Sequence, residues 1–350
     1  MNVYALQALY RRVRSPGARL LAIRTARALG LRTLLVRIDT NDACNLRCPM
    51  CPLGAPDWKP AARPMPVDTF TRIAREVFPR TRLLYLSCGT EPLVTPHFDE
   101  LLGVVARHRP PFVSYCTNGL LLRDRFIAAT VSGAVDEVIL SVDGATKATY
   151  ERIRVGGRFE VLEERLTALT EARQRPGARS PAIRFNFTVQ QDNCHELVAF
   201  ARWMLRFRPA TLQLRFFRPL AGAPKQHDES RTFAEYQQAL PEVQRICAEH
   251  RIELLAPSLP VAAACAVATQ PAPAAAGSGP IDCQLPWFTL YLKANGDVHP
   301  CGVHAPVGNF LRDSFAAIER GPAMRTLRRS LRTAPGPTCV ECQRTGASGV

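Results

Sequence analysis

The sequence predicts an α/β protein: an open, partial (βα)6 TIM-like barrel followed by a small C-terminal Cys-rich module. Three observations support this prediction. From residue 33 onward, short apolar runs alternate with helical stretches. Residues 256–280 then change to Ala, Pro and Ser without a single charge. Beyond them, four cysteines gather between residues 283 and 342.

The chain begins with a basic segment, residues 1–32, for which we expect a helix. One interpretation is an amphipathic helix that lies on anionic lipid. The other is a helix that packs against the barrel. We favour packing, because Pro16 and Gly17 interrupt a long amphipathic pattern.

Residues 33–255 carry the barrel pattern. The expected strands are apolar runs as short as buried parallel strands, at 34–38, 83–86, 112–116, 135–141, 183–189 and 212–217. Helical stretches separate them, at 67–77, 98–107, 122–131, 159–173 and 196–206. Each crossover is expected to be right-handed. Six units fall short of the eight that close a full barrel, so we expect an open one.

Residues 256–280 are expected to form an Ala/Pro-rich linker, and residues 281–350 a compact module. Inside the module, β-rich runs flank Asn295 and Gly296. Asn-Gly between two such runs predicts a hairpin.

Composition narrows the class of protein. The 350 residues carry a net charge of +15 and twelve cysteines, without a secretory signal or an apolar run long enough to span a membrane. We therefore expect a cytoplasmic protein, in which many thiols indicate metal binding before disulfides. The charge fits an anionic substrate, a nucleic acid or membrane surface, or an arginine-rich proteome. No basic stripe interleaved with aromatics appears, so no nucleic acid partner is expected.

Three thiols stand in one short loop after the first predicted strand. Cys44, Cys48 and Cys51 have the spacing C-x3-C-x2-C. Thiolates select iron–sulfur clusters, and three of them leave one iron of a four-iron cluster open to another molecule. A zinc site or inert thiols are the alternatives.

This loop, in this place in a partial barrel, resembles the hallmark of the radical S-adenosylmethionine (SAM) superfamily. The resemblance implies that the three cysteines hold a [4Fe-4S] cluster and that SAM binds the open iron. It also implies an external one-electron donor of the flavodoxin or ferredoxin type. Reductive cleavage of SAM then gives a 5′-deoxyadenosyl radical, which abstracts a substrate hydrogen atom.

Turns after the second and third strands resemble further family segments. Gly89, Thr90 and Glu91 resemble its Gly-Gly-Glu-Pro segment, with Thr90 in place of the second glycine. The resemblance implies contact with the SAM amino group, largely through the backbone, with Glu91 as a possible acceptor. Asn118 belongs to a matching Thr-Asn-Gly turn. Taken alone, both segments are ordinary turns.

Two further segments complete the expected SAM site. Ser141 and Asp143 resemble the family's Ser-Val/Ile-Asp-Gly, and Arg154 belongs to a family Arg-x-Gly segment. The resemblance implies that Ser141 and Asp143 point at the SAM ribose or carboxylate, and that Arg154 pairs with the carboxylate. The alternatives are a helix cap for Asp143 and a surface position for Arg154.

Candidates for substrate contact follow from strand alternation. Asn186 faces the pocket if Arg184 and Thr188 also point inward. Arg215 and Arg218, near the end of the sixth strand, are candidates for an anionic group. Solvent exposure at the barrel mouth is the alternative.

The C-terminal cysteines, Cys283, Cys301, Cys339 and Cys342, resemble the auxiliary modules called SPASM and Twitch. Four thiols imply the shorter, Twitch-like form with one fully ligated [4Fe-4S] cluster that transfers electrons. A structural zinc is the alternative. Apolar packing is the default for the five other cysteines: Cys88, Cys116, Cys194, Cys247 and Cys265. The alternatives are substrate contact for Cys88 and Cys116, at strand ends near the pocket, and a reactive thiol for Cys265 in the linker.

A closed auxiliary cluster suits a redox outcome. We expect oxidation, or a related modification such as epimerisation or decarboxylation, of a sugar, aminocyclitol or nucleoside-type metabolite, with an anionic substrate among the options. One alternative is a maturase that acts on a ribosomal peptide. The other is a non-catalytic iron–sulfur or zinc scaffold, which would not cleave SAM.

Overall fold

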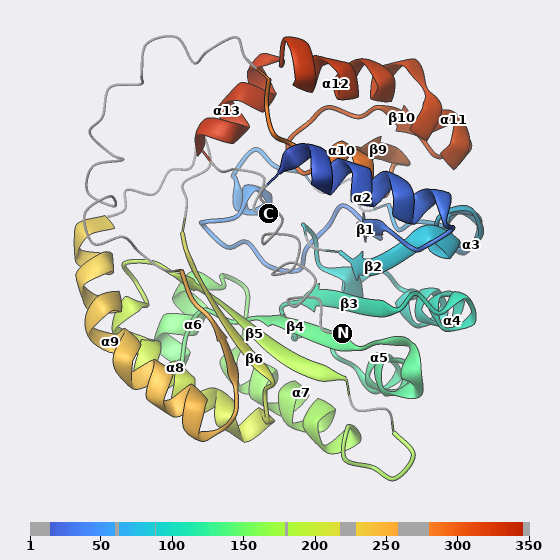
Figure 1. The fold of residues 1–350 in the computed structure, drawn as a ribbon. Helices are drawn as coiled ribbons and strands as arrows, with labels where there is room; N and C mark the ends of the chain where they lie inside the picture. The colour runs from blue at the N-terminus through green and yellow to red at the C-terminus, as the bar shows by residue number, and fades with distance from the viewer. Residues whose placement is uncertain are drawn as a thin grey trace.

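The computed structural model describes residues 15–59, 63–87, 89–178, 181–217, 229–257 and 280–345. Strands and helices alternate along the barrel part of the chain (Figure 1). The strands are β1 (Leu34–Ile38), β2 (Thr81–Leu86), β3 (Phe112–Thr117), β4 (Glu137–Ser141), β5 (Ala182–Val189), β6 (Thr211–Phe216) and β7 (Glu253–Leu255). The helices among them are α3 (Val67–Val77), α4 (Phe98–His108), α5 (Asp124–Ala129), α6 (Lys147–Ile153), α7 (Phe159–Ala172), α8 (Leu197–Trp203) and α9 (Glu229–Glu249).

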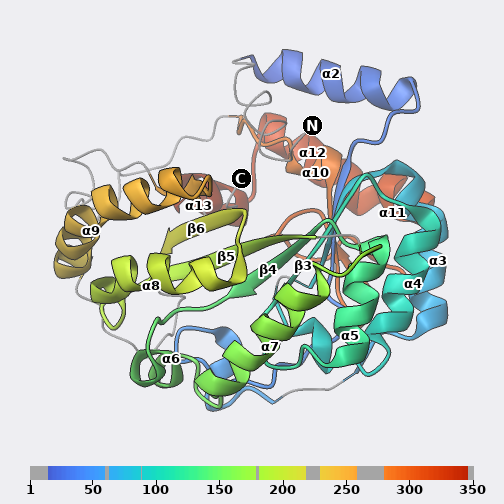
Figure 2. The ribbon, with the colours of Figure 1, turned by 90° about the horizontal axis from the view of Figure 1, so that it is seen from below.

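All strands of the barrel part pair in parallel and in sequence order, from β1 to β7. Figures 1 and 2 show the curved sheet with helices along its outer side. The predicted α/β class with a parallel, barrel-like sheet is therefore confirmed.

Most element bounds follow the predicted pattern closely, but β7 is a seventh parallel strand beyond the six expected, and one predicted helix differs. β1 and α3 have the predicted bounds, and the other strands differ by at most two residues at an end. The helix predicted at 122–131 is instead the short α5 followed by a π-helical turn, Thr130–Ala134. Gly133 has φ 115° there, so regular helical geometry cannot continue.

The N-terminal basic segment contains helix α2 (Pro16–Ala28). Pro16 begins this helix and does not interrupt it, because the first helical position needs no amide hydrogen. Ser15 Oγ caps it by accepting from the Ala18 amide at 3.3 Å. Packing on the barrel was expected, and in the same segment Arg32 Nη1 donates to the Arg109 carbonyl at 2.9 Å, after α4. The helix also contacts the C-terminal module. Its Arg27 donates to the Trp287 carbonyl at 3.3 Å, in the C-terminal module.

The C-terminal module extends the barrel sheet. It contains α10 (Leu285–Phe288), β8 (Thr289–Leu292), β9 (Asp297–His299), β10 (Gly308–Asn309), α11 (Phe315–Arg320), α12 (Pro322–Thr333) and α13 (Pro337–Thr345). Strand β8 pairs in parallel with β1, so the strand order is β10-β9-β8-β1 to β7. β8 and β9 form the predicted Asn-Gly hairpin, with Gly296 at φ 86°.

The two faces of the sheet differ in chemistry. The outer face packs on the helices through large apolar side chains such as Phe185 and Phe187, which contact Phe200 of α8. The inner face is more polar, and Arg37 lies over the Tyr291 ring at 4.9 Å. The barrel lumen is therefore lined by groups that suit a polar ligand.

No helix among the described residues is both long and apolar enough to cross a membrane.

Candidate functional site

Most residues of the predicted SAM site lie at or just beyond the carboxyl ends of the strands, where parallel sheets bind ligands. The loop with the first three cysteines follows β1. Cys48 is buried, and Cys44 and Cys51 are half-buried. The backbone folds tightly there, because a Cβ on Gly54 would stand 2.2 Å from the Cys48 carbonyl oxygen. Only glycine fits that position without a backbone shift.

Asn41 fixes the entry of this loop. Its side-chain amide donates to the Glu91 carbonyl at 2.8 Å and accepts from the Ala43 amide at 2.7 Å. The Glu91 amide donates in turn to the Ala43 carbonyl at 3.0 Å. The sequence analysis missed Asn41. Its signal was a polar residue between a buried strand and the first cysteine, where a buried amide must be paired.

Glu91 is buried, and its carboxylate accepts from the chain itself. Its partners are Thr117 Oγ1 and the Asn118 amide, both at 2.7 Å, and the Leu93 amide at 3.1 Å. Burial raises the pKa of Glu91 to about 7, although these donors favour the charged form. Glu91 therefore ties the end of β2 to the turn after β3.

Asn118 connects that turn to the cysteine loop. Its side-chain nitrogen donates to Asn45 Oδ1 at 2.8 Å and lies 3.9 Å from Cys44 Sγ. Its oxygen accepts from the Leu120 amide at 3.1 Å. The predicted Thr-Asn-Gly turn and the first thiol are thus neighbours.

A buried ion pair stands on the other side of the loop. Arg154 Nη2 lies 2.6 Å from Asp143 Oδ2, and Arg154 Nη1 lies 3.9 Å from Cys48 Sγ. The second Asp143 oxygen accepts from the Thr188 amide at 2.7 Å. Burial opposes the charge on Arg154, but the attraction of Asp143 and Cys48 prevails and raises its pKa. Arg154 is therefore a permanent cation beside the Cys48 thiol.

This geometry removes two of the alternatives. Asp143 does not cap the following helix, because the cap of α6 is Thr146, whose hydroxyl accepts from the Thr149 amide. Arg154 is not a surface residue, since its side chain is 13% exposed.

Two of these thiols, Cys44 and Cys48, lie in surroundings that disfavour the thiolate form unless a cation is present. Burial raises the pKa of Cys44 to about 11 and raises that of Cys48, whereas Arg154 acts in the opposite direction on Cys48. Nearby, Thr90 Oγ1 and Arg154 Nε are buried without a hydrogen-bond partner. Three neighbouring thiols beside unpaired buried polar atoms fit an iron–sulfur cluster with a polar ligand, because a bound metal stabilises the thiolate form.

Among the described residues, no group of three His, Cys, Asp or Glu side chains is arranged to hold a single metal ion.

The predicted substrate contacts lie on the lumen side. Asn186 accepts from Arg184 Nε at 3.0 Å, on the face opposite Phe185 and Phe187. Arg215 is exposed and pairs in register with Thr188. Arg218 and Cys88 lie outside the described residues.

Ser141 and Cys116 form a second lumen group. Ser141 Oγ and Cys116 Sγ lie 3.2 Å apart, at the ends of β4 and β3. Gln213 Oε1, on β6, is buried without a hydrogen-bond partner among the described residues, and Gln213 pairs in register with Asn186. Cys116 packs against the apolar cluster of Leu83, Tyr85 and Ile139, as the default for this cysteine predicts. Its half-buried thiol lies within hydrogen-bond distance of Ser141 as well.

The four C-terminal cysteines come from separate elements. Cys283 precedes α10, Cys301 follows β9, and Cys339 and Cys342 lie on α13. Burial raises the pKa of Cys283 to about 11, and the other three thiols add to this shift. The fold therefore gathers all four thiols in one region.

Two of the remaining cysteines are buried, as predicted. Cys247 belongs to the apolar core, and Cys194 Sγ lies 2.8 Å from Glu235 Oε2. Cys265 lies outside the described residues.

Comparisons with known proteins agree with this arrangement. Residues 38–180 match the model of the radical SAM superfamily, and residues 283–343 match that of SPASM, an iron–sulfur cluster-binding domain. The tungsten-containing aldehyde ferredoxin oxidoreductase cofactor-modifying protein of Pyrococcus furiosus is 29% identical over 174 residues, 48% of this chain and 47% of that protein. A GTP 3′,8-cyclase of Mycobacterium sp. is 31% identical over 140 residues, 39% of this chain and 40% of that protein. The chain thus spans less than half the length of these curated relatives.

Two solved structures have a similar fold. SuiB of Streptococcus suis, bound to its precursor peptide SuiA, has a TM-score of 0.65 at 14% identity, over 92% of this chain and 73% of that one. The enzyme anSMEcpe with bound AdoMet has a TM-score of 0.60 at 14% identity, over 83% and 82% of the chains. At such identities, the likeness concerns the fold alone.

Proposed function

Because the chain belongs to the radical SAM superfamily and carries a C-terminal iron–sulfur cluster-binding domain, we propose that it is an enzyme that cleaves SAM reductively to oxidise a small metabolite. The observation that carries this proposal is the cysteine loop with Arg154 against Cys48 and Asn118 against Cys44. We assign residues 33–255 to the barrel and residues 281–350 to the auxiliary module.

Cys44, Cys48 and Cys51 hold the first [4Fe-4S] cluster in this proposal. With cluster and SAM bound, one electron splits SAM into methionine and a 5′-deoxyadenosyl radical, which removes a hydrogen atom from the substrate. The Arg154 cation favours the thiolate form of Cys48 and lowers the cost of a buried anionic cluster.

The remaining residues of this edge position SAM. The Glu91 carboxylate already accepts from three donors, so Glu91 acts as a brace between two strand ends. We assign contact with the SAM amino group to Gly89 and Thr90. The unpaired Thr90 hydroxyl supports this assignment. Asn118 and Ser141 lie at the same edge, next to the cluster loop and the lumen respectively.

The Asp143–Arg154 pair receives the SAM carboxylate. Arg154 Nε is buried without a partner, and Arg154 remains charged. Its guanidinium therefore has a donor to spare after the bond to Asp143.

Cys283, Cys301, Cys339 and Cys342 hold the second [4Fe-4S] cluster. Four thiols leave no iron open, so this site accepts or donates electrons and does not bind substrate. An electron acceptor near the barrel favours dehydrogenation of an alcohol over a redox-neutral reaction.

The lumen supports a small, polar and anionic substrate, such as a sugar, aminocyclitol or nucleoside derivative. Arg215 offers a cation, and the unpaired Gln213 Oε1 and Asn186 offer hydrogen bonds at the same strand ends. We include Arg218, the next arginine along the chain, as a further contact for the anionic group.

Modification of a peptide is the second candidate. SuiB was solved with a precursor peptide, and the present fold resembles it over 92% of the chain. This likeness in fold supports peptide modification as a candidate, but it does not distinguish it from the oxidation of a small metabolite.

The first experiment is anaerobic reconstitution, followed by iron, sulfide and zinc analysis and a dithionite-plus-SAM assay for 5′-deoxyadenosine. About eight irons per chain with 5′-deoxyadenosine formed supports both clusters. About four irons and one zinc would make the C-terminal site structural. Neither iron nor cleavage would leave only the scaffold interpretation, and a screen of sugars, aminocyclitols, nucleosides and peptides separates the two substrate classes.

A further inference from the structure

Two cationic helices, far apart in the sequence, pack side by side at the edge of the C-terminal module (Figure 1). Neither α2 nor α12 contains an acidic residue. Together they carry seven arginines: Arg19, Arg24, Arg27, Arg325, Arg328, Arg329 and Arg332. Like charges at this density repel, so the arrangement is costly unless anions balance it.

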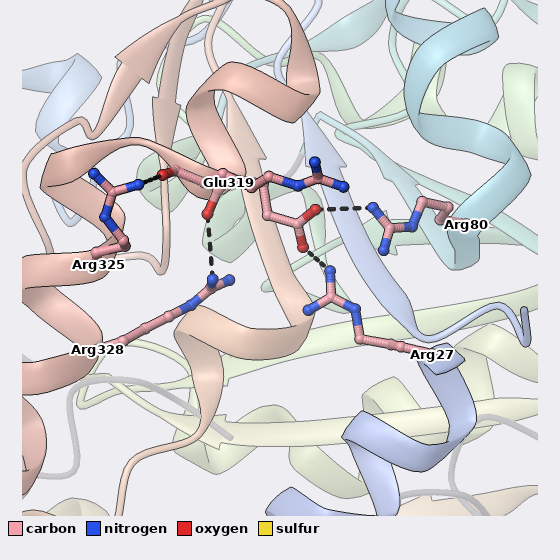
Figure 3. A pocket seen from close by; sticks show the side chains of 6 residues that line it. Arg27, Arg80, Glu319, Arg325 and Arg328 are labelled. Atoms are coloured by element: carbon pink, nitrogen blue, oxygen red, sulfur yellow. Dashed lines mark hydrogen bonds and ion pairs between the residues drawn. The ribbon is translucent and has the colours of Figure 1, made fainter. Parts of the chain in front are cut away.

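The cavity between these helices and the barrel holds one carboxylate among five arginines (Figure 3). Glu319 pairs with Arg27, and with Arg80 at 2.8 Å. Burial, followed by repulsion from Arg80 and Arg328, lowers the pKa of Arg27 to about 10. Glu319 thus balances only part of the charge around this cavity of about 360 Å³.

A second cavity, of about 550 Å³, continues the first one because both are lined by Arg27 and Arg328. Trp287 lines it, with the Arg328 and Arg332 guanidinium carbons 5.8 and 5.6 Å from its ring centre. We call the two cavities together the arginine groove. Arg24, Arg329 and Arg332 contact no carboxylate among the described residues and are exposed.

The position of the groove excludes the substrate as its occupant. Arg80 directly precedes β2, whereas Gly89 and Thr90 follow the opposite end of that strand. Six strand residues span about 20 Å, so a small molecule in the groove does not reach the SAM site.

The groove borders the segment that carries Cys283. Trp287 belongs to α10, which starts two residues after Cys283. The Ile281 amide donates to the Leu331 carbonyl at 2.7 Å, so α12 lies directly on the segment that carries Cys283. Electron transfer between protein-bound centres acts over a distance and needs no contact between the reactants.

We propose that the arginine groove is the docking surface for an acidic one-electron carrier protein, which exchanges electrons through the auxiliary thiol site. This inference rests on the proposed function. In the oxidation proposed above, one electron leaves the reduced auxiliary cluster and reduces the oxidised carrier by one electron, and no bond forms or breaks. Complementary charge steers the encounter and makes it sensitive to salt.

The test measures binding of an oxidised, strongly acidic flavodoxin to the reconstituted full-length protein by calorimetry, at several salt concentrations. The variant reverses two exposed charges, Arg329→Glu with Arg332→Glu. The control makes the same charge change elsewhere, at the exposed Arg107 and Arg175. We expect binding about tenfold weaker or worse in the groove variant, with a flatter salt dependence, and little change in the control.

Equal loss in the groove variant and the control would show a non-specific charge effect and overturn the proposal. Neutral replacements, Arg24→Gln with Arg329→Gln, repeat the test if the reversed charges prevent folding. Duplex DNA and phosphatidylserine vesicles are the competing probes, and tighter binding of either one through the same arginines also overturns the proposal.

Dithionite-driven SAM cleavage in the same preparations separates the two claims. If wild type and variant both cleave SAM but neither binds the carrier, the docking surface is wrong and the proposed enzyme activity stands. Loss of cleavage in the wild type removes the proposed function itself.

Discussion

The two thiol sites are built in opposite ways. At the first site, the thiols of Cys44, Cys48 and Cys51 share one loop, and side chains from other strand ends contact it. At the second, Cys283, Cys301 and the α13 pair come from three separate segments.

This difference concerns what holds each site before a metal binds. The first site has a protein frame of buried polar contacts, so its shape is largely set by the fold. The second site depends on the packing of α10, β9 and α13, so we expect metal binding itself to contribute to its order. The following predictions test this comparison, from the largest expected effect to the smallest.

The two sites should fail differently when one thiol is removed. Cys44→Ala should abolish 5′-deoxyadenosine formation, because the cluster that binds SAM is lost. Cys339→Ala should retain cleavage that is uncoupled from product. Each variant should fall from about eight to about four irons per chain. Equal loss of cleavage in both would show that the auxiliary site is structural.

Breaking the buried Asp143–Arg154 ion pair at the first site should lower the free energy of unfolding. Arg154→Leu leaves the buried Asp143 carboxylate unpaired, and we expect it to lower the free energy of unfolding by about 3 kcal/mol. Asp143→Asn together with Arg154→Leu should recover much of that loss, since no buried charge remains. Urea unfolding of the metal-free proteins measures both, and no recovery would contradict a role for the charge pair.

The Glu91 brace should give the metal-free protein a pH dependence. Burial raises the pKa of Glu91 from 4.5 to about 7, so the folded state binds a proton that the unfolded state has released. Stability should therefore fall as pH rises from 4.5 towards 7, by up to about 3 kcal/mol. Glu91→Gln should flatten this part of the profile. A variant profile parallel to wild type would assign the dependence to other groups.

The Lys293–Asp39 pair, which joins the C-terminal module to the barrel, should contribute least to the free energy of unfolding. Lys293, at the end of β8, pairs with Asp39 at 2.5 Å, next to Gly89. The lysine side chain is 46% exposed, so Lys293→Ala should cost only about 0.5 kcal/mol. A double-mutant cycle with Asp39→Asn measures this coupling, and a value above about 2 kcal/mol would mean that the two regions are not separable.

Local patterns predicted much of this molecule. Apolar runs located β1 to β6, because buried parallel strands have a length and composition that a window of sequence contains. The residues near the first site were predicted in the same way, since each follows a strand end. Their bonding was not, and the engagement of Glu91 with Thr117 appears only when β2 and β3 are paired.

Contacts between distant segments had no local signal. The pairing of β8 with β1 and the ion pairs of Glu319 with Arg27 and Arg80 join residues more than 200 positions apart. The arginine groove was invisible for the same reason. The arginines are spread along the sequence, so their clustering becomes visible only in the fold, where α2 and α12 pack together.

The pairing of β8 with β1 also dictates an order of events during synthesis. Strand β1 emerges from the ribosome early, yet one of its two neighbours follows about 250 residues later, as the 254-residue separation of Lys293 and Asp39 shows. Until then, β1 exposes an open edge, which is a template for pairing with another nascent chain. A chain that stops before residue 289 would keep this edge. Premature termination should therefore yield aggregation, and not a smaller working barrel.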